Sequence, residues 1–511
     1  MLRRSLAHLQ AAEFLYELHV SPEHVYTFKH ALTQEVAYQS LLQRTRTQYH
    51  QHIAQVLAER FPDAVATRPE LLAHHYTEAG LGTQAITYWQ RAGQRASERS
   101  ANVEAIGYFT KALELLKRLP DTPERAQYEL DVHLALGTAL VLTRGHAAPE
   151  VEATYARACE LCRQLGDTPQ VFSALLGLMR FSFHRGELAT AHDLGEQLLH
   201  LAERLDDAGL LVRAHHMLAE NLVWVGDFVG ARVHAEQGMA RYTPQQHRAL
   251  MVRYGTDSGV GCRTNASTAL WVLGYPDQAR QWSDEALALA QALAHPFSLG
   301  LALYSAAYLH QLRREGALTH THAEAVTALA TEQGFPIWMA LGPRLRGWAL
   351  AEQGAVGAGL AQMRQGLAAW QATGARVRPS SLTLLAGVYG QAGQPEEGLH
   401  MLAEAQAVAQ ATGERFWEAE LVRRKGELLL MLATDHQAEA ETCFHQAIEI
   451  ARRQEAQSWE LRAAMSLSRL WQHQGKRAAA YDLLAPVYGW FTEGFDTADL
   501  QDAKALLDAL A

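Results

Sequence analysis

The feature that most constrains this chain is a pair of helical patterns between Trp89 and Ala112. Apolar and small residues recur there three or four positions apart, which places them on one face of a helix. They are Trp89, Ala92, Gly93 and Ala96, then, after a break, Ala105, Phe109 and Ala112. Small residues let two helix axes approach to roughly 8–10 Å. The stretch predicts a helical hairpin, with Asn102 as N-cap of its second helix, whose apolar face must be covered by further copies.

Similar hairpins are predicted along most of the chain. A small residue recurs at the start of each second helix, with a spacing of about 40 residues. The positions are Ala189, Ala231, Ala279, Leu318, Gly359, Gly398, Ala440 and Ala480. Glycine followed by Asp, Pro or Glu stands before most of them, as a turn between helices requires. The expected fold class is all-α, a superhelical solenoid of antiparallel helix pairs.

The first hairpin resembles the tetratricopeptide repeat. The residues that occupy the places of that pattern in register are Trp89, Ala92, Gly93, Ala105, Phe109 and Ala112. The proline of the pattern would fall at Lys117, and Pro120 comes slightly later. Helices longer than those of the ~34-residue repeat explain the longer period. The resemblance implies a curved array with a concave groove that binds a peptide or a protein.

The composition limits the class of protein. The chain has 511 residues, of which 48% are hydrophobic and 20% charged, as in a folded globular protein. A net charge of −10 gives no general attraction to nucleic acid or to an anionic membrane. Four cysteines indicate a reducing compartment. Because we find neither a signal peptide nor an apolar run long enough to span a bilayer, the expected location is cytoplasmic.

The N-terminal segment, residues 1–62, differs from the repeats. Residues 1–20 are expected to form an amphipathic helix, and residues 24–28 an extended stretch. Two apolar stripes follow, Leu32, Val36, Ala37, Leu41 and Leu42, then Ile53, Val56, Leu57 and Phe61.

Within it, the stretch 28–54 resembles the junction after the ATPase module of STAND-type signalling proteins, many of which also carry a class III adenylate or guanylate cyclase domain. The residues that carry this resemblance are Phe28–Leu32, Glu35–Tyr38, Leu41, Leu42, Arg46, His50, Ile53 and Ala54. It implies that residues 1–62 are the tail of a winged-helix subdomain. The chain contains no GxxxxGK[ST] phosphate loop, so it lacks that route to ATP.

The C-terminal stretch, residues 458–511, looks like the end of the same cyclase, ATPase and repeat proteins. We therefore expect tetratricopeptide-like repeats over residues 63–490 and a capping helix within residues 491–511. A final amphipathic helix would cover the apolar face that the last hairpin leaves open. If the resemblance holds at both ends, the chain is a fragment or a split gene product of a larger signalling protein.

No motif predicts a catalytic, cofactor or metal site. The adjacent pairs His74-His75 and His215-His216 diverge on a helix and cannot easily share a metal. A helical Cys159-x-x-Cys162 has no second pair, whereas a structural zinc needs four ligands. The glycine-rich stretch 254–263, YGTDSGVGCR, is interpreted as a long loop between repeats.

Candidate binding residues come from the expected groove. In a tetratricopeptide array the first helix of each hairpin lines the concave side, and aromatic and arginine side chains anchor partners well. The positions are Phe181, Arg213, His216, Glu220, Trp224, Trp271, His310, Arg344 and Trp348. The alternative for Trp224, Trp271 and Trp348 is packing between neighbouring hairpins.

The favoured hypothesis is a non-catalytic sensor or scaffold, the regulatory repeat region of a STAND-type ATPase or adenylate cyclase-like protein. Its partner would be a protein or peptide in the groove, or an ATPase or cyclase module, with no nucleic acid and no membrane. The alternative is part of a STAND-class transcriptional regulator that acts through a partner or a separate DNA-binding domain. The chain has no basic recognition helix at its C-terminal end, which weighs against direct DNA binding.

Overall fold

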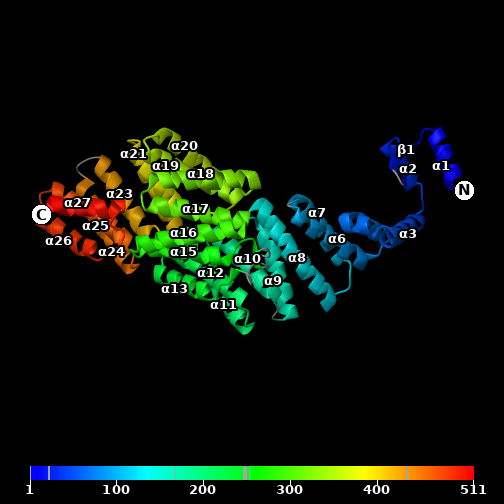
Figure 1. Cartoon of the computed structure of the whole chain (residues 1–511), viewed down its shortest axis with the longest axis horizontal. Coiled ribbons are helices and arrows are strands. Elements are labelled where there is room, and N and C mark those ends of the chain that lie inside the picture. Colours follow the sequence, from blue (N-terminus) through cyan, green and yellow to red (C-terminus); the bar gives the residue numbers. More distant parts are fainter. Residues whose placement is uncertain are drawn as a thin grey trace. The chain divides into compact units, whose positions relative to one another are not determined.

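The computed structural model describes residues 2–20, 23–99, 101–166, 169–244, 250–251, 254–432 and 436–511. The chain separates into two compact units, Met1–Ala139 and Leu140–Ala511. Each unit is described by itself, and most of its helices and strands are labelled in Figure 1.

The first unit begins with a short helix and a strand pair. Its elements are α1 (Leu2–Ala11), β1 (Leu15–Val20), β2 (Glu23–Phe28), α2 (Ala31–Gln39), α3 (Gln43–Arg60), α4 (Pro62–Thr67), α5 (Pro69–Glu78), α6 (Gly82–Glu98), α7 (Asn102–Leu116) and most of α8 (Pro123–Arg144). The single helix predicted for residues 1–20 is wrong, because residues 15–20 pair with residues 23–28 in an antiparallel ladder. The extended stretch predicted for residues 24–28 is confirmed. Aromatic and aliphatic residues that alternate with polar ones favour a strand over a helix there.

The apolar stripes of the N-terminal segment lie largely on its surface. Leu32 and Val36, on α2, are 71% and 60% exposed, and Leu42, just before α3, is 78% exposed. Ile53 on α3 is also exposed. The described part of this unit therefore leaves these side chains uncovered. The assignment of residues 1–62 to a winged-helix tail stays a prediction.

The hairpin predicted around Trp89 is confirmed by α6 and α7. The small and aromatic residues on its inner face are all buried, namely Trp89, Ala92, Gly93, Ala96, Ala105, Phe109 and Ala112. A Cβ at Gly93 would lie 2.4 Å from the Phe109 ring, so only glycine admits the ring there. The expected cap is wrong, because Asn102 is the first residue of α7 and Ala101, which has no side-chain bond, is the N-cap.

The second unit is a row of helical hairpins, so the expected all-α solenoid is confirmed. Its helices are α9 (Pro149–Leu165), α10 (Pro169–Arg185), α11 (Leu188–Arg204), α12 (Ala208–Val225), α13 (Phe228–Arg241), α15 (Ser258–Val272), α16 (Pro276–Leu293), α17 (Pro296–Leu312), α18 (Gly316–Gln333), α19 (Pro336–Glu352), α20 (Val356–Ala372), α21 (Pro379–Gln391), α22 (Pro395–Thr412), α23 (Glu418–Leu432), α24 (Gln437–Arg453), α25 (Gln457–His473), α26 (Arg477–Gly489) and α27 (Ala498–Leu510).

In the eight described hairpins from α10/α11 to α25/α26, the small-residue position lies at one fixed place in the second helix. It is the fourth residue after the N-cap, and it is buried at Ala191, Ala231, Ala279, Thr319, Gly359, Gly398, Ala440 and Ala480. Two of the predicted positions are therefore wrong, since Ala189 and Leu318 are exposed. Thr319 takes the small-residue place because its hydroxyl donates to the Glu315 carbonyl at 3.0 Å, so no polar group is left unpaired.

The glycine-rich stretch 254–263 is not the long loop that the sequence suggested. Asp257 is the N-cap of α15, and its carboxylate accepts the Val260 backbone N–H at 2.9 Å. Residues from Ser258 onward are helical, and Ser258 to Cys262 are buried. The glycines serve close packing, because a Cβ at Gly261 would lie 2.0 Å from the His216 ring.

Hairpins far apart in sequence touch each other in the second unit, as the green and the orange-to-red helices do in Figure 1. The backbone N–H of Arg376 donates to the His184 carbonyl, and that of Arg415 to the Trp224 carbonyl, both at 2.9 Å. We call the set of contacts between hairpins one superhelical turn apart the seam. It comprises these two hydrogen bonds, the hydrogen bond from Ser458 to Trp271 and the ion pair of Arg314 with Asp499. The seam joins the end of α10 to the segment that leads into α21, which we call the approach to α21. In the same way it joins the end of α12 to the approach to α23. Counted from α10 up to the start of α21, the described residues form five hairpins, α10/α11, α12/α13, α15/α16, α17/α18 and α19/α20, so one turn of the superhelix takes five.

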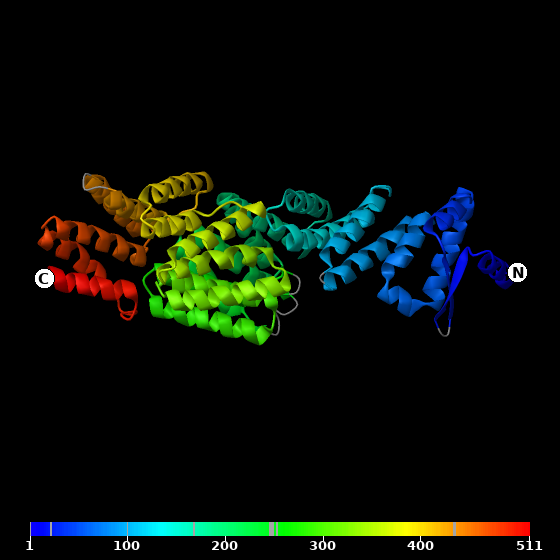
Figure 2. The same cartoon turned by 90° about the horizontal axis from the view of Figure 1, so that it is seen from above.

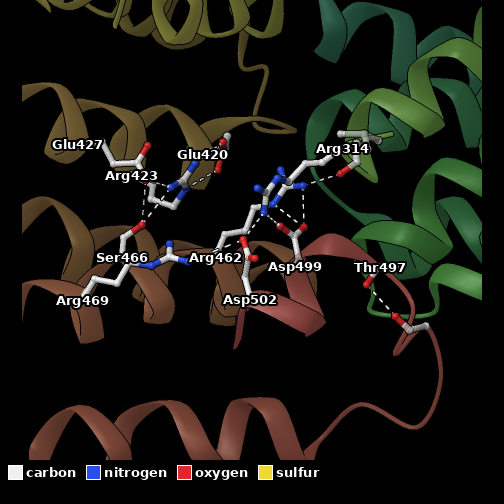
Figure 3. A network of polar contacts seen from close by, with 12 residues as sticks. Arg314, Glu420, Arg423, Glu427, Arg462, Ser466, Arg469, Thr497, Asp499 and Asp502 are labelled. Atoms are coloured by element: carbon white, nitrogen blue, oxygen red, sulfur yellow. Dashed lines mark hydrogen bonds and ion pairs between the residues drawn. The ribbon is translucent and has the colours of Figure 1, made fainter. Parts of the chain in front are cut away.

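The seam continues to the C-terminal end of the unit, which is seen from another direction in Figure 2. Ser458, in α25, donates its hydroxyl to the Trp271 carbonyl at the end of α15, at 2.5 Å. The next contact is ionic: Arg314, after α17, pairs with Asp499 of α27 at 3.1 Å. Figure 3 shows Asp499 between Arg314 and Arg462, whose Nε donates to it at 2.7 Å.

The helix-ending residues at the seam have a left-handed backbone. Gly186, Gly226 and Gly274 have φ of 78°, 89° and 91°. A Cβ at Gly226 would lie 2.9 Å from the Arg415 Cβ, and one at Gly274 would lie 2.8 Å from the Gln457 Cβ. The equivalent Gly393, at the end of α21, meets no later hairpin among the described residues and has nothing within 4 Å of such a Cβ. Glycine is therefore required at Gly226 and Gly274 by space as well as by φ.

Candidate functional site

The first helices of five consecutive hairpins enclose a cavity of about 130 Å³ in the second unit. We call it the central cavity. Its lining residues are Arg180, Phe183 and His184 of α10; His216, Glu220, Val223 and Trp224 of α12; Thr256, Thr264, Asn265 and Thr268 of or beside α15; Phe297, Leu301, Tyr304, Ser305 and Tyr308 of α17; Ile337, Trp338, Leu341 and Arg344 of α19; and Trp370, Arg378 and Phe416. The last two belong to the approaches to α21 and α23, so the seam forms part of the wall.

Aromatic rings form much of this wall. Trp338 lies 5.4 Å from Tyr304 and 5.5 Å from Phe297, measured between ring centroids. Across the seam, Phe416 makes an edge contact with Trp224 at 5.4 Å. Such rings contribute large apolar contact areas of fixed shape, which favours binding of an apolar group.

Arg378 is fixed in the wall by contacts from both sides. Its guanidinium lies 4.5 Å from the ring centroid of Phe183 and 4.5 Å from that of Trp224. Nη1 donates to the buried Glu414 carboxylate at 3.0 Å, and Nη2 donates to the Phe183 carbonyl at 3.3 Å. Burial raises the pKa of Glu414, while Arg378 and, less strongly, Arg344 oppose the rise. Arg378 therefore ties α10 and α12 to the hairpin that closes the turn.

A second ion pair and two neutral imidazoles line the α10–α12 side. Arg180 Nη1 donates to Glu220 at 2.6 Å. Burial, helped by the nearby His146, Arg180 and Arg378, holds the pKa of His184 well below its usual range. The pKa of His216 is also held far down, by burial and by Arg213 and Arg180. Both rings are therefore uncharged at neutral pH and add polar atoms without positive charge.

Arg344 enters the cavity from α19 and is only 4% exposed. Its Nη2 donates to the Tyr304 hydroxyl at 2.5 Å, and its Nη1 donates to the Ser381 hydroxyl. Its Nε has no acceptor among the described residues. Two hydroxyl groups thus orient the guanidinium without neutralising it.

The structure brings four of the nine predicted groove residues together. His216, Glu220, Trp224 and Arg344 line the central cavity. Trp348 lines a separate small cavity of about 40 Å³, beside Trp417 and Arg462.

The other four predicted groove residues do not line the central cavity. Phe181 is buried in α10. Arg213 donates to the Thr256 hydroxyl at 2.9 Å, and burial lowers its pKa to about 10. Trp271 packs edge-on against Trp459 of α25 at 4.8 Å, a contact across the seam and not between neighbouring hairpins. His310 bonds to Glu315 and stacks on His322 at 5.3 Å.

Several wall residues were missed by the sequence reasoning. Tyr304, Trp338 and Phe183 lie on first helices, but none of them stands three or four positions from a predicted groove residue of its own helix. A search for aromatic clusters on the first helices could have found them. Arg378 and Phe416 precede their helices and reach the cavity through the seam, for which the repeat pattern holds no signal.

The candidate chemical motifs are structural. Cys159 and Cys162 are buried in α9, and burial raises their pKa to about 12 and about 11, so both thiols stay protonated at neutral pH. Within the described ranges, no three His, Cys, Asp or Glu side chains gather as metal ligands would. Over the same part of the chain, we find no helix with the length and apolarity needed to traverse a bilayer.

Comparison with known proteins gives distant likenesses. No protein-family model matches the chain. An uncharacterized protein of Rhizobium meliloti (strain 1021) is 24% identical over 470 residues, which are 89% of this chain and 44% of that protein. The chain thus spans less than half the length of that relative.

Among solved structures, a Rap protein complexed with competence and sporulation factor is 13% identical, with a TM-score of 0.46, over 77% of this chain and 99% of that one. A chain of the APC/C hetero-tetramer Cut9-Hcn1 is 12% identical, with a TM-score of 0.49, over 91% and 87%. A STAND protein with a tetratricopeptide repeat sensor from Pyrococcus horikoshii is 14% identical, with a TM-score of 0.40, over 78% and 56%.

Proposed function

We propose that the chain is a non-catalytic protein-interaction scaffold that holds a peptide segment of its partner at the central cavity. The observation that carries this proposal is the wall itself, built from the first helices of five hairpins and closed by the seam. Aromatic side chains with a few fixed polar groups are the usual lining of a recognition site. Because one turn of the superhelix surrounds the cavity, an occupant would contact several hairpins at once.

The polar groups of the wall support binding more than chemistry. Arg180 is paired with Glu220, and Arg378 with Glu414. The Thr268 hydroxyl donates to the Thr264 carbonyl, at 3.2 Å, within its own helix. A nucleophilic hydroxyl needs an adjacent base. His216 is held neutral, but no hydrogen bond joins it to a hydroxyl in the described part of the wall.

The regulatory role within a STAND-type ATPase or cyclase-like protein is the finer part of the proposal. It rests on the resemblance of both ends of the chain to such proteins, and it agrees with a relative more than twice as long. A peptide bound within the turn would alter the seam and so the curvature of the array. The net charge of −10 does not favour the alternative of a DNA-bound transcriptional regulator.

The test is to fill the cavity. Ser305 is a half-buried residue of its wall, so Ser305→Trp should occupy the space without altering the seam. Thr321→Trp on α18, the outer helix of the same hairpin, is exposed and serves as control. A library of short random peptides is selected on the wild-type chain, and the enriched peptides are titrated into both variants. Binding should be lost in Ser305→Trp and kept in Thr321→Trp. Equal binding to both variants, or no enriched peptide, would refute the proposed site.

A further inference from the structure

The charges around the central cavity do not balance. Three guanidinium groups line it, those of Arg180, Arg344 and Arg378. Arg180 has its own carboxylate in Glu220, and Arg378 has Glu414. Among the ion pairs of the described residues, Arg344 has none, and its bonded neighbours are the hydroxyls of Tyr304 and Ser381.

A buried cation without a counter-ion is unfavourable, and the nearest negative charge only partly offsets it. Arg344 lowers the pKa of Glu414 through space, so the two charges attract each other without a hydrogen bond between them. Glu414 is, however, hydrogen-bonded to Arg378 at 3.0 Å, and one carboxylate cannot neutralise two guanidinium groups. One positive charge is therefore left at the cavity, together with an unbonded Nε on Arg344.

The geometry points to a carboxylate as the missing group: we infer that the central cavity takes one acidic side chain of the partner peptide, with its carboxylate on Arg344. This inference rests on the proposed function and names the chemistry of its ligand. A planar guanidinium matches a carboxylate better than any other common side-chain group. The rings of Tyr304 and Trp338, 5.4 Å apart, line the same cavity and would contact the aliphatic stem of Asp or Glu.

The size of the cavity favours a side chain over a chain terminus. Its volume, about 130 Å³, is close to that of an engineered protein cavity of about 150 Å³ that binds benzene. Such a space admits one side chain. A terminal carboxylate would bring its own backbone amide and side chain to the same point, so it needs more room beside Arg344 than a side-chain carboxylate does.

The probe is a library of short random peptides with amidated C-termini, so that their only carboxylates are side chains. Peptides retained by the wild-type chain should share one Asp or Glu. Replacing that residue by Asn or Gln should weaken binding roughly tenfold to a hundredfold, the value of a charge-assisted hydrogen bond. The same peptides with a free C-terminus should bind no more tightly.

The assignment to Arg344 is tested by a cycle of variants. Arg344→Gln should bind the acidic peptide and its amide analogue alike, as weakly as the wild type binds the analogue. Arg344→Lys, which keeps the charge, should retain part of the preference. Arg346→Gln is the matched control, because Arg346 lies on the same helix and faces Glu324 at 3.8 Å. It should keep the full preference.

The outcomes separate this inference from the proposed function. Peptides that Ser305→Trp excludes but that tolerate the amide replacement would overturn the inference and leave the proposed function standing. An acid preference that survives in Arg344→Gln, or that disappears in Arg346→Gln, would place the carboxylate elsewhere and also overturn it. Binding that depends on a free C-terminus would show that the carboxylate on Arg344 is that of a chain terminus, and would overturn the inference of an acidic side chain. If no peptide is retained, both fall.

Discussion

The backbone N–H of Arg415 donates a 2.9 Å hydrogen bond to the carbonyl of Trp224, joining the approach to α23 to the last turn of α12. The side chain of Trp224 packs against that of Phe416, the residue after Arg415, with 5.4 Å between the ring centroids. One residue thus forms a wall of the central cavity through its side chain and the seam through its backbone. A change of curvature at the seam would therefore move the Trp224 side chain in the cavity wall.

The first prediction concerns glycine at the seam. Gly226→Ala should destabilise the second unit by more than Gly393→Ala, although both positions have positive φ. Ala at Gly393 costs only the left-handed conformation, about 1 kcal/mol. At Gly226 a further ~1–3 kcal/mol is expected, because the new methyl group would lie 2.9 Å from the Arg415 Cβ. Thermal unfolding of the two variants measures the difference, and equal shifts would contradict a packed seam.

The second prediction concerns the hairpin of α6 and α7. Gly93→Ala places a methyl group 2.4 Å from the Phe109 ring and should destabilise the first unit by about 1–3 kcal/mol. Gly107→Ala, on α7, meets nothing within 4 Å and should stabilise it by about 0.5–1 kcal/mol through helix propensity. The opposite signs can be read from urea midpoints. Two changes of the same sign would mean that the helices cross elsewhere.

The third prediction concerns acid stability near the seam. Arg423 and Arg424 donate to the buried Glu420 at 2.7 and 3.0 Å and hold its pKa at about 2 against the cost of burial. A folded-state pKa below the unfolded one adds stability that is complete above about pH 4.5 and is lost as the pH falls toward 2. Glu420→Gln should remove about 3 kcal/mol at neutral pH and flatten the loss in acid.

Asp508→Asn is the control for this prediction, because Asp508 forms an exposed pair with Lys504 at 3.2 Å. Its effect should stay below about 1 kcal/mol. An unchanged acid unfolding curve in Glu420→Gln would show that the arginines do not depend on this carboxylate.

The fourth prediction concerns a histidine pair in the second unit. His215 Nδ1 lies 3.1 Å from His234 Nδ1, and burial, with His234 and Arg241, lowers the pKa of His215 to about 4. The unfolded chain therefore binds more protons between about pH 6.5 and 4, so stability falls as the pH falls through that window and levels off below it. His215→Leu should reduce this slope. Unfolding midpoints measured from pH 7 to pH 4 test it, and an equal slope in the variant would contradict the assignment.

The hairpins could be predicted from the sequence because their signals are local. Small residues at helical spacing mark contacts within one hairpin, as Gly93 and Phe109 show. The predicted position was wrong by one residue at Leu318, because the small-residue place there is filled by Thr319. Its hydroxyl donates to a carbonyl of the same turn, so threonine can be buried in that place. The glycine-rich stretch around Gly261 was predicted to be a loop because glycine is typical both of flexible loops and of helices that pack closely.

The seam and the part of the cavity wall that it forms could not be predicted in this way. The contact between Arg378 and Phe183 joins residues 195 positions apart. Its existence depends on the curvature summed over five hairpins, and a period in the sequence does not contain that angle. The groove positions were counted along single helices, which found Glu220 and Arg344 but could not separate Trp224, at the cavity, from Trp271, packed on Trp459.

The closure of each superhelical turn after five hairpins also limits how this array can evolve. In an open solenoid a repeat can be added or lost with little effect beyond its two neighbours. Here removing one hairpin from the middle would shift every later partner by a whole unit, so that Gly226 would no longer face Arg415 nor Arg314 face Asp499. Length variation should therefore be tolerated at the ends of the array and selected against within it, and the second unit should lose its structure in one cooperative step instead of fraying repeat by repeat.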